Sequence, residues 1–310
     1  MRVNVIFALL FNPKRSKLMK NIPLLRSNKI LMLLILISSM LIIDNQLFAQ
    51  EYKIKTIVID AGHGGKDSVT RGRYSSEKEV ALRTALNLGK AIEEQMKDVK
   101  VIYTRTDDTF IPLYERIAIA NDVKADIFIS IHCNDMPVYT QKYISGYTKN
   151  KNGKRVAIYK TRHVKSTSTK GVETFVSGMG RVNEQDDAIK RENAAIFLED
   201  NYKENYSGFN ADDPESLIIL SLMKNTYRTQ SLKLAKLIQD EYVKVNRVNR
   251  GVQEKSLAVL ARAGMPALLT EIGFISNPDE EDYMNSEAGQ KEIIDCLIKA
   301  IQAYKNSIEI

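Results

Sequence analysis

Short apolar runs alternate with longer amphipathic stretches along most of this chain. Runs rich in β-branched and aliphatic residues predict strands at 55–60, 100–104, 126–132, 171–176 and 266–271. Between them, helical spacing of apolar residues predicts helices at about 77–97, 113–122, 185–204, 215–244 and 287–306. This alternation predicts an α/β fold, a single three-layer domain with a mostly parallel central sheet flanked by helices.

Two polar segments interrupt the alternation. Residues 135–170 are rich in Lys, Thr, Ser and Tyr, which is typical of a surface insertion such as a hairpin. Residues 181–215 combine an acid-rich helical pattern with a loop of Gly, Asn, Asp and Pro. No linker to a second domain is evident, so we expect one domain from 51 to 310 with two insertions, and long excursions of this kind are often functional.

The first 49 residues differ in composition from the rest. A basic stretch precedes the uncharged apolar run Ile30–Ile43, and small Ala49 offers a cleavage position. The apolar run is short for a membrane span, so residues 1–49 are predicted to be a signal peptide, with an uncleaved N-terminal anchor as the alternative. We therefore expect an exported protein, periplasmic or in the cell envelope, with membrane contact only through an uncleaved N-terminal segment.

The charge distribution and the cysteine content bear on nucleic-acid binding and on disulfide bonds. The first 49 residues carry a net +6 of the chain's formal +7, which leaves about +1 for the remainder and gives no reason to expect nucleic-acid binding. Cys133 and Cys296, the only two cysteines, lie far apart in the sequence. They predict two buried free thiols rather than a disulfide framework.

Two of the three histidines end strongly apolar predicted strands. His63 follows VIDAG and is flanked by glycines that allow a sharp bend, and His132 follows FISI. Open α/β sheets place their ligand crevice at such strand ends. A single histidine there is more often structural, but two at equivalent positions favour a shared site.

Two acids begin the predicted helix at 77–97. Glu79 stands three residues after Ser76 and fits a capping box. Glu77 lies instead on the apolar stripe that packs on the sheet, where a carboxylate is costly without a cation or hydrogen bonds. Its alternative role is a first-turn acid that interacts with the helix dipole.

Two imidazoles and a carboxylate around an open position have the composition of a catalytic zinc site. Such a site needs a nearby base, and Glu271 ends the apolar run MPALLT. The alternative for Glu271 is an acid satisfied by backbone donors in the following turn.

The chain resembles the zinc-dependent N-acetylmuramoyl-L-alanine amidases of the Amidase_3 type, related to the cell-separation amidases of Gram-negative bacteria. The blocks that carry the resemblance are IDAGHGGKD at 59–67, SEKEVAL at 76–82, SIHCN at 130–134, KGVETFV at 170–176, RGVQEKSLAVL at 250–260 and MPALLTEIGFISNPDEE at 265–281. The resemblance implies zinc on His63, Glu77 and His132, with Glu271 as the catalytic acid/base.

Cys133 stands where the family usually has alanine and is interpreted as a core residue, with a thiolate ligand as the minor alternative. His163, between basic residues in the longer insertion, is interpreted as a surface residue.

The resemblance also implies a reaction and a form of control. The reaction is hydrolysis of the amide between N-acetylmuramic acid and L-alanine in peptidoglycan, for cell-wall remodelling or daughter-cell separation. The acid-rich helix corresponds in place to one that covers the zinc until a protein activator displaces it, and Glu192 is the candidate blocking residue. An ordinary solvated helix is the alternative. We expect a monomer; a zinc peptidase acting within the stem peptide and a non-catalytic peptidoglycan-binding protein remain as other functions.

Overall fold

All five predicted strands belong to one six-stranded sheet. The computed structural model describes residues 53–67, 70–136, 138–166, 168–178, 187–200, 214–255 and 257–309. The predicted strands are β1 (Thr56–Ala61), β2 (Lys100–Tyr103), β3 (Ile127–Asn134), β6 (Val172–Ser177) and β8 (Ala267–Phe274). The sixth, β7 (Asn249–Lys255), was not predicted because its sequence NRGVQEK is polar; it lies at the edge of the sheet, where burial is incomplete.

The strand order brings the ends of the central strands together. It is β2-β1-β3-β8-β6-β7, with every neighbouring pair parallel except β6 and β8. Ala61 of β1 pairs with Ile131 of β3, and His132 of β3 pairs with Glu271 of β8. The carboxyl ends of three adjacent parallel strands therefore meet at one edge of the sheet, as expected for a ligand site.

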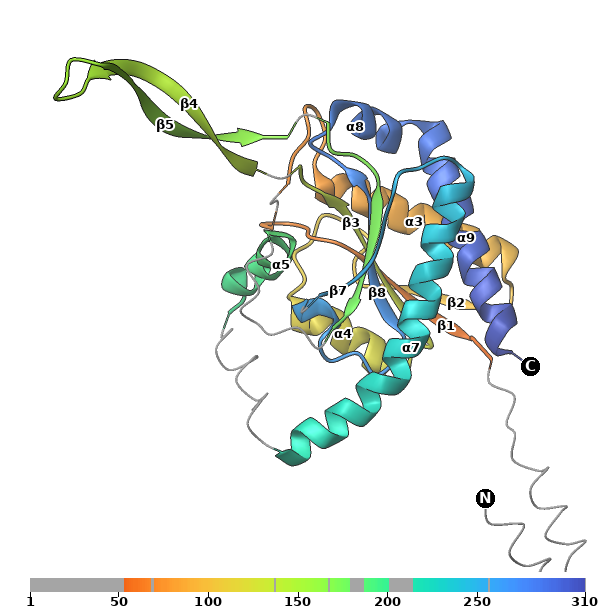
Figure 1. Ribbon diagram of the computed structural model, residues 1–310. Coiled ribbons are helices and arrows are strands. Elements are labelled where there is room, and N and C mark those ends of the chain that lie inside the picture. Colours follow the sequence, from red (N-terminus) through yellow and green to blue (C-terminus); the bar gives the residue numbers. More distant parts are fainter. Residues whose placement is uncertain are drawn as a thin grey trace, which may run out of the picture. The chain divides into compact units, whose positions relative to one another are not determined.

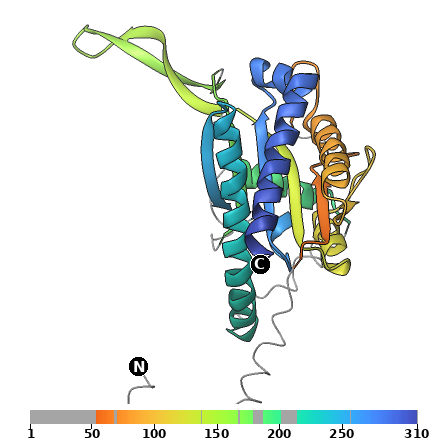
Figure 2. The same cartoon turned by 90° about the vertical axis from the view of Figure 1, so that its right-hand side faces the viewer.

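Helices cover both faces of the sheet (Figures 1 and 2). Side chains alternate along each strand, so Ile57 and Ile59 face one layer while Val58 faces the other. The first layer contains α3 (Glu77–Gln95), α7 (Pro214–Lys244) and α9 (Glu287–Ile308), and the second contains α4 (Leu113–Asp122) and the 3₁₀ turn η5 (Ala258–Leu260). The predicted three-layer fold with a mostly parallel sheet is confirmed.

The two insertions have different structures. Within 135–170, β4 (Val138–Lys149) and β5 (Arg155–Lys165) form the antiparallel hairpin that was predicted. The helix predicted at 185–204 is shorter in its described part: α5 (Asp187–Asn193) gives way to the 3₁₀ helix η4 (Ala194–Leu198). The regular helix ends at Asn193. The side chain of this residue accepts a hydrogen bond from the Ala258 amide, and such side-chain bonds compete with regular helix.

One further helix, α8 (Pro278–Asn285), was not predicted. Asn277 caps it by accepting hydrogen bonds from the amides of Asp279 and Glu280, and Pro278 occupies its first position.

Residues Lys53–Ile310 form one compact unit. The predicted signal peptide or anchor at 1–49 lies outside the described residues. Within the described part of the chain, no helix combines the length and apolar character needed to cross a membrane.

Candidate metal centre

The turn after β1 carries His63 in an unusual backbone conformation. His63 has φ 57°, in the left-handed region that non-glycine residues rarely adopt, and Gly64 and Gly65 continue the turn at φ 126° and 55°. Flanking glycines alone were expected to make the bend, but the histidine itself is part of it. Such strain persists only where surrounding contacts impose it.

Two buried guanidinium groups supply those contacts. Arg116 donates from Nη2 to the carbonyl of His63 at 2.7 Å, and Arg105 donates from Nη2 to the carbonyl of Gly62 at 2.7 Å. Asp60, at the end of β1, accepts from Arg116 Nη1 at 2.8 Å and balances its charge. The turn is therefore held by Arg116 of α4 and by Arg105 of the loop between β2 and α4.

Asp67 orients the imidazole of His63. Asp67 Oδ2 lies 2.9 Å from His63 Nδ1, and both side chains are buried. A carboxylate on one ring nitrogen fixes the tautomer and leaves the other nitrogen as an electron-pair donor. His63 Nε2 lies 3.2 Å from Glu77 Oε1 without hydrogen-bond geometry.

Glu77 is the first residue of α3 and is 1% exposed. Ser76 and Glu79 form the predicted capping box before it, which frees Glu77 from a capping role. Glu77 Oε1 accepts from the amide of Cys133 at 3.0 Å and lies 3.1 Å from His132 Nδ1. Burial would raise the pKa of Glu77, but the charges of His63 and His132 hold it well below its usual value.

The loop before Glu77 is held by a second buried carboxylate. Glu281, in α8, accepts hydrogen bonds from the amides of Arg73, Tyr74 and Ser75. These three donors outweigh burial and lower the pKa of Glu281 to about 2. The start of α3 is thereby fixed against α8.

His132 is the second imidazole of the site, and its Nδ1 faces Glu77 Oε1. Its ring packs against Gly62, where a Cβ atom would lie 2.4 Å from His132 Nε2. Glycine at position 62 is therefore required by the close approach of the second imidazole. The two histidine rings meet edge to face, with centroids 4.8 Å apart.

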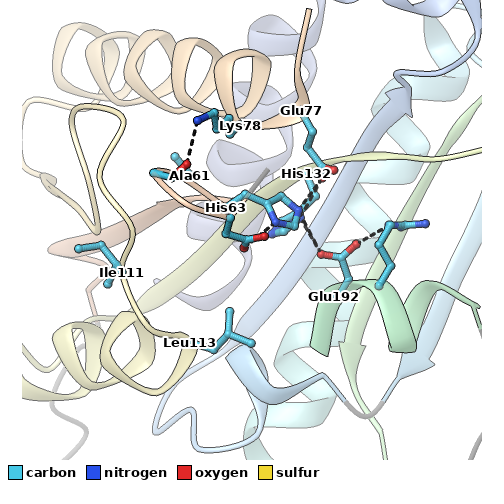
Figure 3. Close-up of polar contacts among 12 residues, drawn as sticks. Ala61, His63, Glu77, Lys78, Ile111, Leu113, His132 and Glu192 are labelled. Carbon is cyan, nitrogen blue, oxygen red and sulfur yellow. Dashed lines mark hydrogen bonds and ion pairs between the residues drawn. The ribbon is translucent and has the colours of Figure 1, made fainter. Parts of the chain in front are cut away.

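Glu192, from α5, completes the group. Its Oε2 lies 2.8 Å from His132 Nδ1 and 3.7 Å from His63 Nε2, and the side chain is 4% exposed. Although burial opposes it, the charges of His132 and Arg191 lower the pKa of Glu192 to about 2. Figure 3 shows the carboxylate reaching from α5 towards the imidazoles. A buried carboxylate in this place does not fit an ordinary solvated helix.

These four side chains fit a bound metal ion. One donor atom from each of His63, Glu77, His132 and Glu192 lies within 4.8 Å of the others. Ligands about 2.0–2.1 Å from a tetrahedral ion are roughly 3.3–3.4 Å apart, close to the separations of 2.8–3.7 Å between the histidine nitrogens and carboxylate oxygens. His63 Nε2 is buried without a hydrogen-bond partner among the described residues, which a cation would explain.

Glu271 lies beside this group but outside it. It is fully buried on β8, next to His132 in the register of the sheet. Its Oε1 accepts from Arg191 Nη2 at 3.3 Å, while Oε2 has no hydrogen-bond partner in the described part of the chain. Burial, followed by the charge of Glu192, raises the pKa of Glu271 well above its usual value.

The sequence comparison decides the family. Residues 57–303 match the N-acetylmuramoyl-L-alanine amidase family. The chain belongs to this family. The predicted membership is confirmed, and the family's enzymes hydrolyse the peptidoglycan amide after which they are named.

Individual relatives of this chain agree with the family assignment. It is 30% identical over 251 residues to the amidase AmiC of Escherichia coli O6:H1, covering 80% of this chain and 52% of AmiC. It is 28% identical over 256 residues to AmiA of Escherichia coli K12, covering 81% of this chain and 76% of AmiA. The chain thus spans about half of AmiC and three quarters of AmiA.

A solved structure shares the fold of this chain. The crystal structure of an N-acetylmuramoyl-L-alanine amidase from Clostridium difficile 630 superposes with a TM-score of 0.54 at 25% identity. The alignment covers 83% of this chain and 99% of the clostridial chain.

The two other residues considered as ligands lie elsewhere in the domain. Cys133 is fully buried in the apolar core on the α3 side of the sheet, and the same burial raises the pKa of its thiol. His163 lies exposed on β5. Neither belongs to the group of potential metal-binding side chains among the described residues.

Two residues at this site were not predicted from the sequence. Asp67 was quoted within IDAGHGGKD, and its position four residues after His63 was the only available signal. Arg191 was not singled out, yet it links Glu192 Oε1, at 2.9 Å from its Nε, to Glu271. Nothing in the local sequence predicts a bridge to β8.

Proposed function

We propose that this protein is a zinc-dependent amidase that hydrolyses the bond between the lactyl group of N-acetylmuramic acid and L-alanine. The observation that carries the proposal is the meeting of His63, Glu77 and His132 beside Glu271. His63 Nε2, Glu77 Oε1 and His132 Nδ1 would hold the ion, and the family membership points to peptidoglycan as the substrate. A bound zinc ion supplies Lewis-acid activation of water and of the scissile carbonyl.

Glu271 is the proposed acid/base. Its Oε2, the oxygen without a partner among the described residues, takes a proton from the attacking water while the water oxygen bonds to the carbonyl carbon. The same oxygen then gives the proton to the amine nitrogen of L-alanine as the carbon–nitrogen bond breaks. A carboxyl group whose pKa is raised by burial suits this return of the proton.

The product identifies the reaction. Mass spectrometry of digested sacculi should show free stem peptides that begin with L-alanine, together with intact glycan. Internally cut stem peptides would identify a zinc peptidase instead. Absence of any soluble product, for wild-type protein and for Glu192 variants alike, would support a non-catalytic peptidoglycan-binding protein.

Glu192 is proposed as an autoinhibitory residue. Its carboxylate occupies the position beside His132 and His63 that water and substrate need. Helix α5 has seven residues, too few for a stable isolated helix, so its place depends on contacts with the rest of the domain. These include Asn193 to the Ala258 amide and Glu199 to the Leu113 amide, at 2.8 and 2.7 Å. A protein activator that competes for this segment would displace Glu192.

We also propose a cellular location, domain bounds and an oligomeric state for the protein. Its substrate is outside the cytoplasmic membrane, and residues 1–49 have the composition of a signal peptide, so we place the protein in the periplasm or cell envelope. The catalytic domain is taken as 51–310, acting as a monomer in cell-wall remodelling or daughter-cell separation.

Asp67 provides a test of the metal site that does not require turnover. Replacing Asp67 with Asn should weaken Zn²⁺ binding by roughly 10–100-fold, because the carboxylate that orients His63 is lost. Competition with a chromophoric chelator measures this affinity, and Asp122→Asn, an exposed change on α4, is the control. Equal zinc affinity in the two variants would contradict the proposed role of Asp67 in orienting His63.

A further inference from the structure

The β4–β5 hairpin stands apart from the catalytic sheet. The two strands pair only with each other among the described residues, and the ribbon projects away from the domain in both views (Figures 1 and 2). With 12 residues in β4, the ribbon is about 40 Å long. An isolated two-stranded hairpin is marginally stable in water, which makes such an extension costly unless it binds something.

The hairpin has a one-sided charge. Residues 138–165 contain eight Lys and Arg residues and no Asp or Glu. The chain beyond residue 49 is close to +1, so the part of it outside the hairpin has a net charge of about −7. The nearly neutral net charge beyond residue 49 is therefore the sum of a basic hairpin and an acidic remainder, called the acidic body below. An anionic surface would attract the ribbon and repel the body.

The ribbon also exposes apolar side chains on both faces. Paired residues share a face, so Tyr143 with Lys160 lies on one face and Ile144 with Tyr159 on the other. The large apolar and aromatic side chains that are 39–65% exposed here are Val138, Tyr139, Tyr143, Ile144, Tyr147, Val156, Ile158 and Tyr159. So many exposed apolar and aromatic side chains on one short element mark an interaction site.

The tip of the ribbon is the most basic part. Lys149, Lys151, Lys154 and Arg155 surround the turn, which Gly153 makes at φ 74°. Arg155 also stacks over the ring of Tyr147 at 3.8 Å, placing a cation and an aromatic ring together near the tip. Cations for lipid phosphates and tyrosine for the headgroup region are the side chains found where proteins enter a membrane interface.

We propose that the hairpin docks the protein, tip first, on an anionic phospholipid surface. A folded protein partner would cover one face and leave the apolar residues of the other face in water. A glycan strand can stack on tyrosine, but it offers no apolar counterpart for the exposed aliphatic residues. A lipid interface surrounds both faces and contains both phosphates and acyl chains. The acidic body would face away from the bilayer.

A vesicle-binding assay on the full chain tests the charge requirement. Vesicles of phosphatidylcholine with about 30% phosphatidylglycerol are compared with phosphatidylcholine alone. The basic N-terminal segment is the same in every variant, so a difference between variants reports on the hairpin. The variant K149Q/K151Q/K154Q/R155Q should lose roughly tenfold or more of the additional affinity for anionic vesicles. Raising the salt to about 0.5 M should reduce that affinity in the wild type.

The matched control removes the same charge from helices. Lys90, Lys236, Lys244 and Lys291 are at least two-thirds exposed on α3, α7 and α9, and K90Q/K236Q/K244Q/K291Q should retain wild-type vesicle binding. Equal binding by the hairpin variant and the helix variant would overturn the proposal.

A fluorescence measurement reports directly on the hairpin and keeps it folded. The chain has no tryptophan, so Tyr159→Trp, at a site 65% exposed, introduces a single probe. We expect a blue shift with anionic vesicles and none with neutral ones. Val243→Trp on α7 should show no shift with either. An unshifted emission from the Tyr159→Trp variant with anionic vesicles would contradict docking, whatever the N-terminal segment does.

Peptidoglycan is the competing anionic ligand. In the Glu271→Gln background, which should leave sacculi intact, the four-residue hairpin variant is expected to pellet with purified sacculi as well as its parent does. Loss of sacculus binding with unchanged vesicle binding would assign the hairpin to the cell wall instead. None of these measurements depends on amidase activity.

Discussion

Glu271→Gln is expected to lower the turnover of purified sacculi by roughly 10²–10⁴-fold while zinc remains bound. Glutamine has nearly the same shape but cannot take a proton from water and pass it to the departing amine. The side chain is fully buried and lies beside His132 without belonging to the group of donor atoms. Its replacement should therefore affect proton transfer and not metal affinity. Release of L-alanine-terminated peptides and the zinc content of the purified protein are the two measurements.

Two further variants make the Glu271 result specific. His132→Ala should lose both zinc and activity, because it removes a proposed ligand. Glu115→Gln makes the same chemical change on an exposed face of α4 and should match the wild type in both measurements. Full activity in Glu271→Gln would reject the assigned acid/base, and loss of zinc in that variant would instead make Glu271 part of the metal site.

Glu192→Ala should have the opposite effect on activity. Removing the carboxylate opens the position next to His132 and His63, and observed activity is proportional to the fraction of molecules whose site is open. We expect basal hydrolysis to rise by roughly tenfold or more, with zinc retained on the three remaining ligands. Stem-peptide release without an added activator provides the measurement.

A graded series distinguishes inhibition from ligation. Glu192→Gln should give a smaller rise than Glu192→Ala, because an amide oxygen of similar shape can still reach the site, and Glu115→Ala should have no effect. If Glu192→Ala instead loses zinc and activity together, as expected for His132→Ala, then Glu192 is a required ligand and α5 is part of the catalytic site.

Arg191 connects the α5 segment to the proposed acid/base. This residue joins Glu192 Oε1 to Glu271 Oε1, so the proposed inhibitory and acid/base groups share one guanidinium. Burial opposes its charge, but the two carboxylates, Glu192 before Glu271, raise the pKa of Arg191 above its ordinary value. Displacement of α5 would remove a cation and an anion from Glu271 together, which limits the net change in charge at that carboxyl.

The sequence by itself determined the class of fold and the positions of four candidate residues. Apolar periodicity identifies a strand or a helix and the face on which a residue lies, so it predicted the three-layer domain and separated Glu77 from the capping residue Glu79. The same periodicity put His63, His132 and Glu271 at strand ends. It could not detect β7, because a polar edge strand lacks the apolar pattern of a buried one.

Only the tertiary structure decided which of these residues meet. Local periodicity does not determine the order of the strands in the sheet. In the structure β8 lies beside β3, and this long-range pairing sets Glu271 next to His132. The left-handed turn at His63 depends on Arg105 and Arg116 from later in the chain, and the burial of Glu192 depends on how α5 folds over the sheet edge. These features arise from contacts between residues far apart in sequence, whose distances no single segment determines.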